Sequence, residues 1–180
     1  STTVLNESSS SVGLGDVSSK PQRNDLSLNV PWKEAIDRSI ARSRKIRGSN
    51  FVQLATVSEE NEPRVRSVVF RGFASREGDL STTMKLITDS RSKKVRDIQC
   101  QSDNMAELLW WFGKSSEQYR FRCRAELIGD DSTDEKLKQL RKEQWGNLSD
   151  KAREQFYWLE PGISYENQCE VPEGGRNEEG

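Results

Sequence analysis

The sequence of 180 residues contains no histidine, and its three cysteines lie far apart without a C-x-x-C pair. Without histidine, neither a Ser-His-Asp or Cys-His nucleophile nor an H-E-x-x-H metalloprotease site can be assembled. An odd number of separated cysteines is typical of a reducing compartment rather than of a disulfide framework or a zinc site. Any chemistry must therefore come from a bound cofactor or from carboxylates and cations.

The chain also lacks a long apolar run. Hydrophobic residues make up only 32% of it, and no stretch approaches the ~20 residues that cross a bilayer. We therefore expect no membrane partner. The formal net charge of −1 also lacks the basic excess that is typical of nucleic-acid binding.

Both ends of the chain are polar. Residues 1–28 include a run of four serines and no helical or strand period, so we expect a disordered N-terminal extension. Residues 166–180 hold five Glu against one Arg, and we expect an acidic flexible tail. Residues 29–165 are enough to bury one hydrophobic core. The sequence predicts one domain in a cytoplasmic protein, with organellar import as an alternative because the N-terminal extension is Ser-rich.

Hydrophobic periodicity predicts the elements of this domain. The strongest strand pattern is residues 118–128, where aromatic and small apolar side chains alternate with charged ones. Further strands are expected over residues 51–57, 65–73, 84–89 and 106–112, and helices over residues 31–47, 92–100, 135–145 and 149–157. Antiparallel neighbours with helices at the ends indicate an α+β fold built on a small β-barrel.

Two segments predict a phosphate site. The first, Arg66-Ser-Val-Val-Phe-Arg71, is a β-branched strand with a guanidinium at each end. The second, residues 87–94, is a strand tip that runs into a helix beginning with hydroxyl and ammonium side chains. Such a helix start offers free backbone N–H groups to an anion. Lys93 and Lys94 oppose the helix dipole there, and a bound anion would remove that conflict.

The order R-x-V-x-x-R, I-T-D-x-R-S-K-K and E-Q-x-R-x-x-x-x-x-E resembles the pyridoxamine 5′-phosphate oxidase family, whose members are FMN-binding split barrels. The resemblance covers about residues 31–162. It implies an antiparallel split β-barrel with flanking helices, FMN as the cofactor and a homodimer with FMN in the interface cleft. The family's C-terminal strand, with its Trp and Arg-x-His group, has no counterpart in this sequence.

The resemblance also implies site residues. The FMN-binding positions are Arg66, Ser67, Val68, Val69, Arg71, Ile87, Thr88, Ser92, Lys93, Lys94 and Gln118. Among them, Arg66 is expected at the phosphate or ribityl chain and Gln118 at the polar edge of the flavin ring. Arg71 is the catalytic candidate, stabilising the reduced anionic ring where the family usually has Lys. Because Arg66 and Arg71 point to opposite faces of a regular strand, both reach one ligand only if the strand twists or bulges near Gly72, or if the ligand wraps around the end of the strand.

The implied activity is oxidation of pyridoxine or pyridoxamine 5′-phosphate to pyridoxal 5′-phosphate, with hydride transfer to the flavin and reoxidation by dioxygen. The family's substrate-phosphate residues are not reproduced between Lys136 and Trp145, so a non-catalytic FMN-binding or sensing protein is an alternative. A single-stranded nucleic-acid-binding module is a second alternative. It rests on the basic residues 42–47 and on the arginines interleaved with aromatics in residues 119–124.

Overall fold

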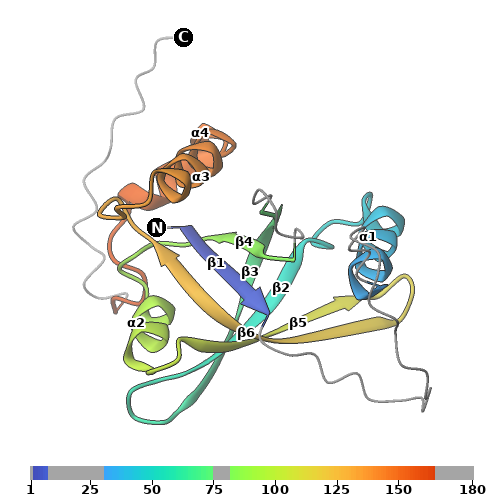
Figure 1. Cartoon of the computed structure of the whole chain (residues 1–180), viewed down its shortest axis with the longest axis horizontal. Coiled ribbons are helices and arrows are strands. Elements are labelled where there is room, and N and C mark those ends of the chain that lie inside the picture. Colours follow the sequence, from blue (N-terminus) through green and yellow to red (C-terminus); the bar gives the residue numbers. More distant parts are fainter. Residues whose placement is uncertain (1, 8–30, 75–81, 165–180) are drawn as a thin grey trace, which may run out of the picture.

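The computed structural model describes residues 2–7, 31–74 and 82–164. Six strands pair antiparallel in the order β1-β4-β3-β2-β5-β6, and β1 pairs with both β4 and β6 to close the barrel (Figure 1). The strands are β1 (Thr2–Glu7), β2 (Phe51–Val57), β3 (Pro63–Phe73), β4 (Met84–Ile87), β5 (Met105–Phe112) and β6 (Glu117–Ile128). The expected antiparallel split barrel of the α+β class is confirmed.

The helices flank this barrel. They are α1 (Pro31–Ser43), α2 (Lys93–Cys100), α3 (Glu135–Gly146) and α4 (Asp150–Glu154), followed by a 3₁₀ turn at Gln155–Tyr157. In Figure 1, α1 and α2 lie at opposite ends of the barrel, and α3 and α4 lie next to each other beside the end of β6. Among the described residues, no helix has the length and apolar character that crossing a membrane requires.

The structure corrects two sequence expectations. Thr2–Glu7, expected as part of a disordered extension, forms β1. The edges of β4 and β6 offer unpaired backbone groups to it on both sides, which a polar composition does not reveal. The first helix ends at Ser43 rather than near Gly48, because the chain continues in turns and Gly48 has a positive φ of 80°. The expectations for residues 8–28 and 166–180 lie outside the described residues.

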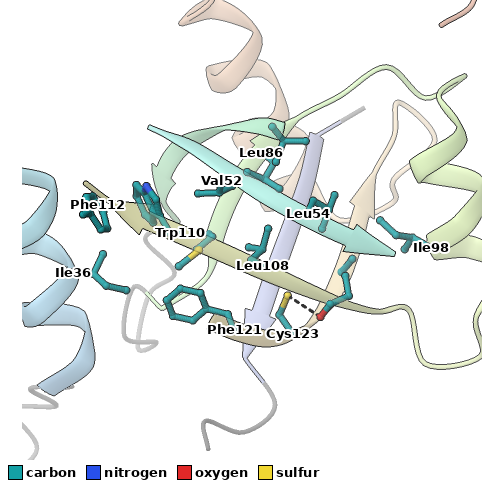
Figure 2. Close-up of a cluster of buried hydrophobic side chains, with 14 residues drawn as sticks. Ile36, Val52, Leu54, Leu86, Ile98, Leu108, Trp110, Phe112, Phe121 and Cys123 are labelled. Carbon is teal, nitrogen blue, oxygen red and sulfur yellow. Dashed lines mark hydrogen bonds between the residues drawn. The ribbon is translucent and has the colours of Figure 1, made fainter. Parts of the chain in front are cut away.

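The barrel interior is filled by alternate side chains of the strands. Large buried side chains come from β2, β4, β5 and β6, and the helices α1 and α2 add Ile36 and Ile98 at the two ends (Figure 2). Trp110 is 1% exposed, and its indole N–H donates to the carbonyl of Ser49 at 2.8 Å. The predicted alternation of β6 holds from Tyr119 to Ala125. The two ends of this core fix the positions of α1 and α2.

The β3 strand contains a bulge near Gly72, as expected from the five-residue spacing of Arg66 and Arg71. The pairing of β3 with β4 shifts between Phe70 and Phe73, and Gly72 inside this bulge has a φ of 97°. Glycine adopts this backbone conformation without the steric cost that other residues pay. The bulge expected near Gly72 is therefore confirmed.

Candidate functional site

A cluster of polar side chains lies where β3, the end of β4 and the start of α2 meet. The ammonium of Lys94 donates to the hydroxyl of Thr88 at 2.9 Å, and this hydroxyl lies 3.4 Å from that of Ser92. Both hydroxyl residues are buried, with 8% and 3% of their surface exposed. Arg66 of β3 is the electrostatic neighbour of Lys94. We call Arg66, Thr88, Ser92 and Lys94 the cationic cradle.

The two cations of the cradle disfavour each other. Burial, followed by the positive charge of Arg66, holds the pKa of Lys94 below its ordinary value, although Asp89 and Asp97 act in the opposite direction. A partly buried ammonium that feels the charge of a guanidinium is stabilised by any anion that binds both. The cradle therefore has the electrostatics of an anion site.

The first turn of α2 adds backbone donors to the cradle. Ser92 is the N-cap residue, but its side chain makes no capping hydrogen bond, because its hydroxyl donates to the carbonyl of Asp89 at 2.7 Å. The N–H groups that open a helix have no partner within the helix. An anion at this position would receive hydrogen bonds from backbone and side chains together.

A buried carboxylate, that of Asp97, contacts the cradle through Arg66. Asp97 of α2 is 3% exposed and accepts hydrogen bonds from Thr56 at 2.7 Å, from Arg64 at 3.1 Å and from Arg66 at 3.1 Å. Sequence reasoning missed this residue. The signal was present, because Asp97 lies between the apolar positions Val95 and Ile98 of a short amphipathic helix, where a charged side chain needs a partner.

The remaining predicted site residues lie elsewhere. Lys93 is exposed and lies next to Gly162, whereas Lys94 turns towards Thr88. Arg71 is exposed on β3, and no interaction joins it to the cradle in the described part of the chain. Gln118 is exposed at the start of β6, where it pairs with Trp111 of β5, and the preceding residue Glu117 accepts a hydrogen bond from Ser39 of α1. One chain thus brings together Arg66, Thr88, Ser92 and Lys94, but not Lys93, Arg71 or Gln118.

The positions implied by resemblance alone follow the alternation of their strands. Val68 is buried in the core, Ser67 is exposed and Val69 is partly exposed. Ile87, next to Thr88, lines a cavity of about 580 Å³ between the end of β4, α3 and the 3₁₀ turn. Its other lining residues are mainly charged or aromatic: Asp89, Ser90, Arg91, Asp130, Lys138, Arg141, Lys142, Trp145 and Phe156.

A split barrel whose cations, hydroxyls and helix N–H groups converge on one point defines a protein that binds a phosphate-bearing ligand. Residues 29–129 match the family model described as "Pyridoxamine 5'-phosphate oxidase, FMN-binding domain". The chain belongs to this family, and FMN is its cofactor. The cradle fits the phosphate group of FMN, because it supplies two cations and unpaired helix donors at one place.

Known proteins support the same assignment. The chain is 32% identical over 134 residues to pyridoxine/pyridoxamine 5'-phosphate oxidase 2 of Arabidopsis thaliana. This match covers 74% of the chain and 64% of the Arabidopsis protein. The chain is 27% identical over 105 residues to pyridoxine/pyridoxamine 5'-phosphate oxidase of Microcystis aeruginosa, covering 58% and 44%. The chain therefore spans less than two thirds of the length of either curated relative.

A solved structure is similar in fold as well as in sequence. The protein from Nostoc punctiforme is described as a pyridoxamine 5'-phosphate oxidase-related, FMN binding protein. It has a TM-score of 0.67 and 37% sequence identity to this chain, over 76% of this chain and 67% of that one. The likeness in both sequence and fold agrees with the assignment of the barrel to an FMN-binding family.

Proposed function

We propose that the cationic cradle holds the terminal phosphate of FMN. The observation that supports this placement best is that α2 carries Lys94 in its first turn and also holds Arg66, whose guanidinium donates to Asp97 of the same helix at 3.1 Å. The guanidinium offers paired donors to phosphate oxygens, and the ammonium adds a point charge. Thr88 and Ser92 add hydroxyl groups that can turn towards an anion.

The placement is tested by comparing FMN with riboflavin, which lacks the phosphate. Lys94→Gln and Arg66→Gln should each weaken FMN binding by about tenfold or more, because a charge-assisted hydrogen bond contributes roughly 1.5–3 kcal/mol. Riboflavin binding should change little. Lys151→Gln, an exposed lysine on α4, is the matched control for the lost charge. Equal losses for both ligands would contradict the placement.

We propose further that the protein is an oxidoreductase acting on pyridoxine or pyridoxamine 5′-phosphate. The proposal rests on the family and on the two relatives from Arabidopsis thaliana and Microcystis aeruginosa, which are both pyridoxine/pyridoxamine 5'-phosphate oxidases. Bound FMN supplies the two-electron acceptor, and the protein orients the reactants around it. Arg71, an exposed cation on β3, is the candidate for stabilising negative charge on the reduced flavin ring, because it stands where the family usually has Lys.

The activity is tested by adding pyridoxine 5′-phosphate to the FMN-loaded protein without oxygen. Bleaching of the flavin absorbance, lost or slowed at least tenfold in Arg71→Gln, is the expected result. An unchanged spectrum with FMN still bound would indicate the alternative, an FMN-binding or sensing protein without turnover. The affinity for FMN, measured in the same samples, separates loss of activity from loss of cofactor.

We also propose a homodimer in which the outer sheet face is the contact surface. Phe51, Val65 and Trp111 are 49%, 70% and 50% exposed on β2, β3 and β5. These strands are neighbours in the barrel, with Val65 opposite Ala55 and Phe51 opposite Val69, and large apolar side chains exposed on one sheet face are typical of an interface. Gln118 pairs with Trp111 across the sheet. A dimer formed on this face is how we propose that Gln118 reaches a flavin held by the partner subunit.

A further inference from the structure

We propose that Asp97 is the positioning residue of the FMN site, because it fixes the guanidinium of Arg66 in the orientation that meets the phosphate. This inference rests on the proposed function, which places the phosphate at the cradle. Asp97 does not touch the phosphate in this proposal. It acts through Arg66, and its own position is set by α2, the helix that also provides Lys94 and Ser92.

The hydrogen bonds of Arg66 define which of its donors are occupied. Its Nη1 donates to the carbonyl of Leu54 at 3.2 Å and to the hydroxyl of Thr56 at 2.6 Å, and its Nη2 donates to Asp97 at 3.1 Å. A guanidinium has five N–H donors in a rigid plane. Among the described residues, Nε–H and one N–H of Nη2 have no partner.

The hydroxyl of Thr56 accepts from Nη1 and donates to the Asp97 oxygen that Nη2 reaches, so Asp97 lies at the Nη1–Nη2 end of the group and the two free donors share the Nε–Nη2 edge. They form the fork that binds two oxygens of a carboxylate or phosphate side by side. Leu54, Thr56 and Asp97 occupy the opposite edge and the tip, so the group cannot rotate without breaking charge-assisted bonds. The protein therefore prepares one bidentate edge for a ligand before the ligand arrives, which lowers the ordering cost of binding.

Burial makes the carboxylate effective in this role. Asp97 is 3% exposed, whereas the side chains of Arg64 and Arg66 are 32% and 21% exposed. A buried carboxylate is held in place by its partners, and removing it leaves their cations uncompensated. Thr56, which is 4% exposed, both accepts from Arg66 and donates to Asp97. The network thus joins β2, β3 and α2 at the back of the cradle.

The positioning role and a simple charge effect predict opposite changes in FMN affinity when Asp97 is removed. A negative charge near a bound phosphate repels it, so removing Asp97 would raise FMN affinity if only its charge mattered. If Asp97 instead orients Arg66, its removal lowers FMN affinity. Coupling energies within one hydrogen-bond network predict a loss of about tenfold in the ratio of FMN to riboflavin affinity for Asp97→Asn.

A double-mutant cycle identifies the residue through which Asp97 acts. Asp97→Asn, Arg66→Gln and the double variant are titrated with FMN and riboflavin by flavin fluorescence. We expect Asp97→Asn to lower the affinity ratio in the native background and to have no further effect in the Arg66→Gln background. Arg64→Gln removes another partner of the same carboxylate and should leave the ratio unchanged.

Thr56→Val provides a second variant if Asp97→Asn does not fold. It keeps the shape of the side chain and removes the hydroxyl that links Arg66 to Asp97, so the ratio should fall by about threefold. An unchanged or raised ratio of FMN to riboflavin affinity in folded Asp97→Asn or Thr56→Val protein would overturn the inference. So would a loss from Asp97→Asn that is equally large in the Arg66→Gln background. If Arg66→Gln and Lys94→Gln themselves leave the ratio unchanged, the proposed phosphate placement fails instead.

Discussion

At the residue scale, the site depends on a few side chains whose charges conflict until a ligand binds. Lys94 is held beside Arg66, and its pKa is lowered mainly by burial and then by that guanidinium. Lys94 was predicted from the sequence because hydroxyl and ammonium groups at a helix start indicate an anion, and Arg66 was predicted from the family resemblance of its strand. Asp97 could not be predicted in the same way, since its partners Thr56 and Arg64 come from strands that only the folded barrel brings together.

The lowered pKa of Lys94 predicts how FMN binding depends on pH. The FMN phosphate is a dianion above about pH 6, and Lys94 must be protonated to bind it. FMN affinity relative to riboflavin should therefore fall as the pH rises through the pKa of Lys94, below the ordinary lysine range. The charged groups that set this pKa are Arg66 of β3, Asp89 of the loop before α2 and Asp97 of α2 itself.

Arginine at this position provides the control, because a guanidinium stays protonated throughout this range. Fluorescence titrations of the native protein and of Lys94→Arg at several pH values measure the effect. The alkaline loss of affinity should be absent in Lys94→Arg. A loss of the same size in both proteins would show that another group titrates.

At the element scale, the barrel ends are fixed by helices that dock through specific contacts. The hydroxyl of Ser39 on α1 is fully buried and donates to Glu117, and it also lies 3.0 Å from the hydroxyl of Tyr119. The strands were predicted well, because alternation of side chains is a strong local signal. Strand β1 was not predicted, since its pairing depends on two edges distant in sequence.

Ser39→Ala tests the docking of α1. The substitution removes a buried hydrogen bond to a charged group and should lower the free energy of unfolding by about 1–3 kcal/mol. Urea denaturation followed by tryptophan fluorescence measures it. The FMN-to-riboflavin affinity ratio should not change, because α1 and α2 lie at opposite ends of the barrel (Figure 1). A changed ratio would indicate that α1 contributes to the cradle.

The carboxylate that Ser39 contacts adds a pH dependence of stability. Hydrogen bonds from Ser115 and Ser39 hold the pKa of Glu117 below its ordinary value. The stability that this group contributes is present above the unfolded pKa and is lost as the pH falls through the lowered folded value. Ser39→Ala should therefore cost less stability in acid than at neutral pH. An equal cost at both would contradict this coupling.

Gly72→Ala tests the bulge of β3. A Cβ at this position has space, since its nearest neighbour is the Lys85 side chain at 3.8 Å. The positive φ of 97° is nevertheless strained for any other residue. We expect the free energy of unfolding to fall by about 1 kcal/mol or more. An unchanged stability would indicate that the strand can lose its bulge at no cost.

At the scale of the whole molecule, one chain does not assemble every residue that the family resemblance implies. Arg66, Thr88, Ser92 and Lys94 meet at the end of the barrel that carries α2, whereas Gln118 lies at the start of β6. The family resemblance implied these residues as one set, because linear order does not reveal how far apart the folded chain holds them. The exposed apolar sheet face is the surface that we propose brings two chains together.

The dimer is tested by placing charge on this face. Val65→Glu combined with Trp111→Glu should shift the protein from dimer to monomer, because two carboxylates would be buried in an apolar interface. Sedimentation velocity with and without FMN measures the mass. Tyr157→Glu, at an aromatic residue 84% exposed on the 3₁₀ turn, is the matched control and should remain dimeric. A double variant that stays dimeric would place the interface elsewhere.

The most direct measurement of the central claim is a crystal structure of the protein with bound FMN. We expect phosphate oxygens within about 3 Å of Lys94 Nζ and of the free edge of the Arg66 guanidinium. Leu54, Thr56 and Asp97 should still hold the other side of that group. A phosphate bound away from these two cations, in well-defined density, would contradict the account.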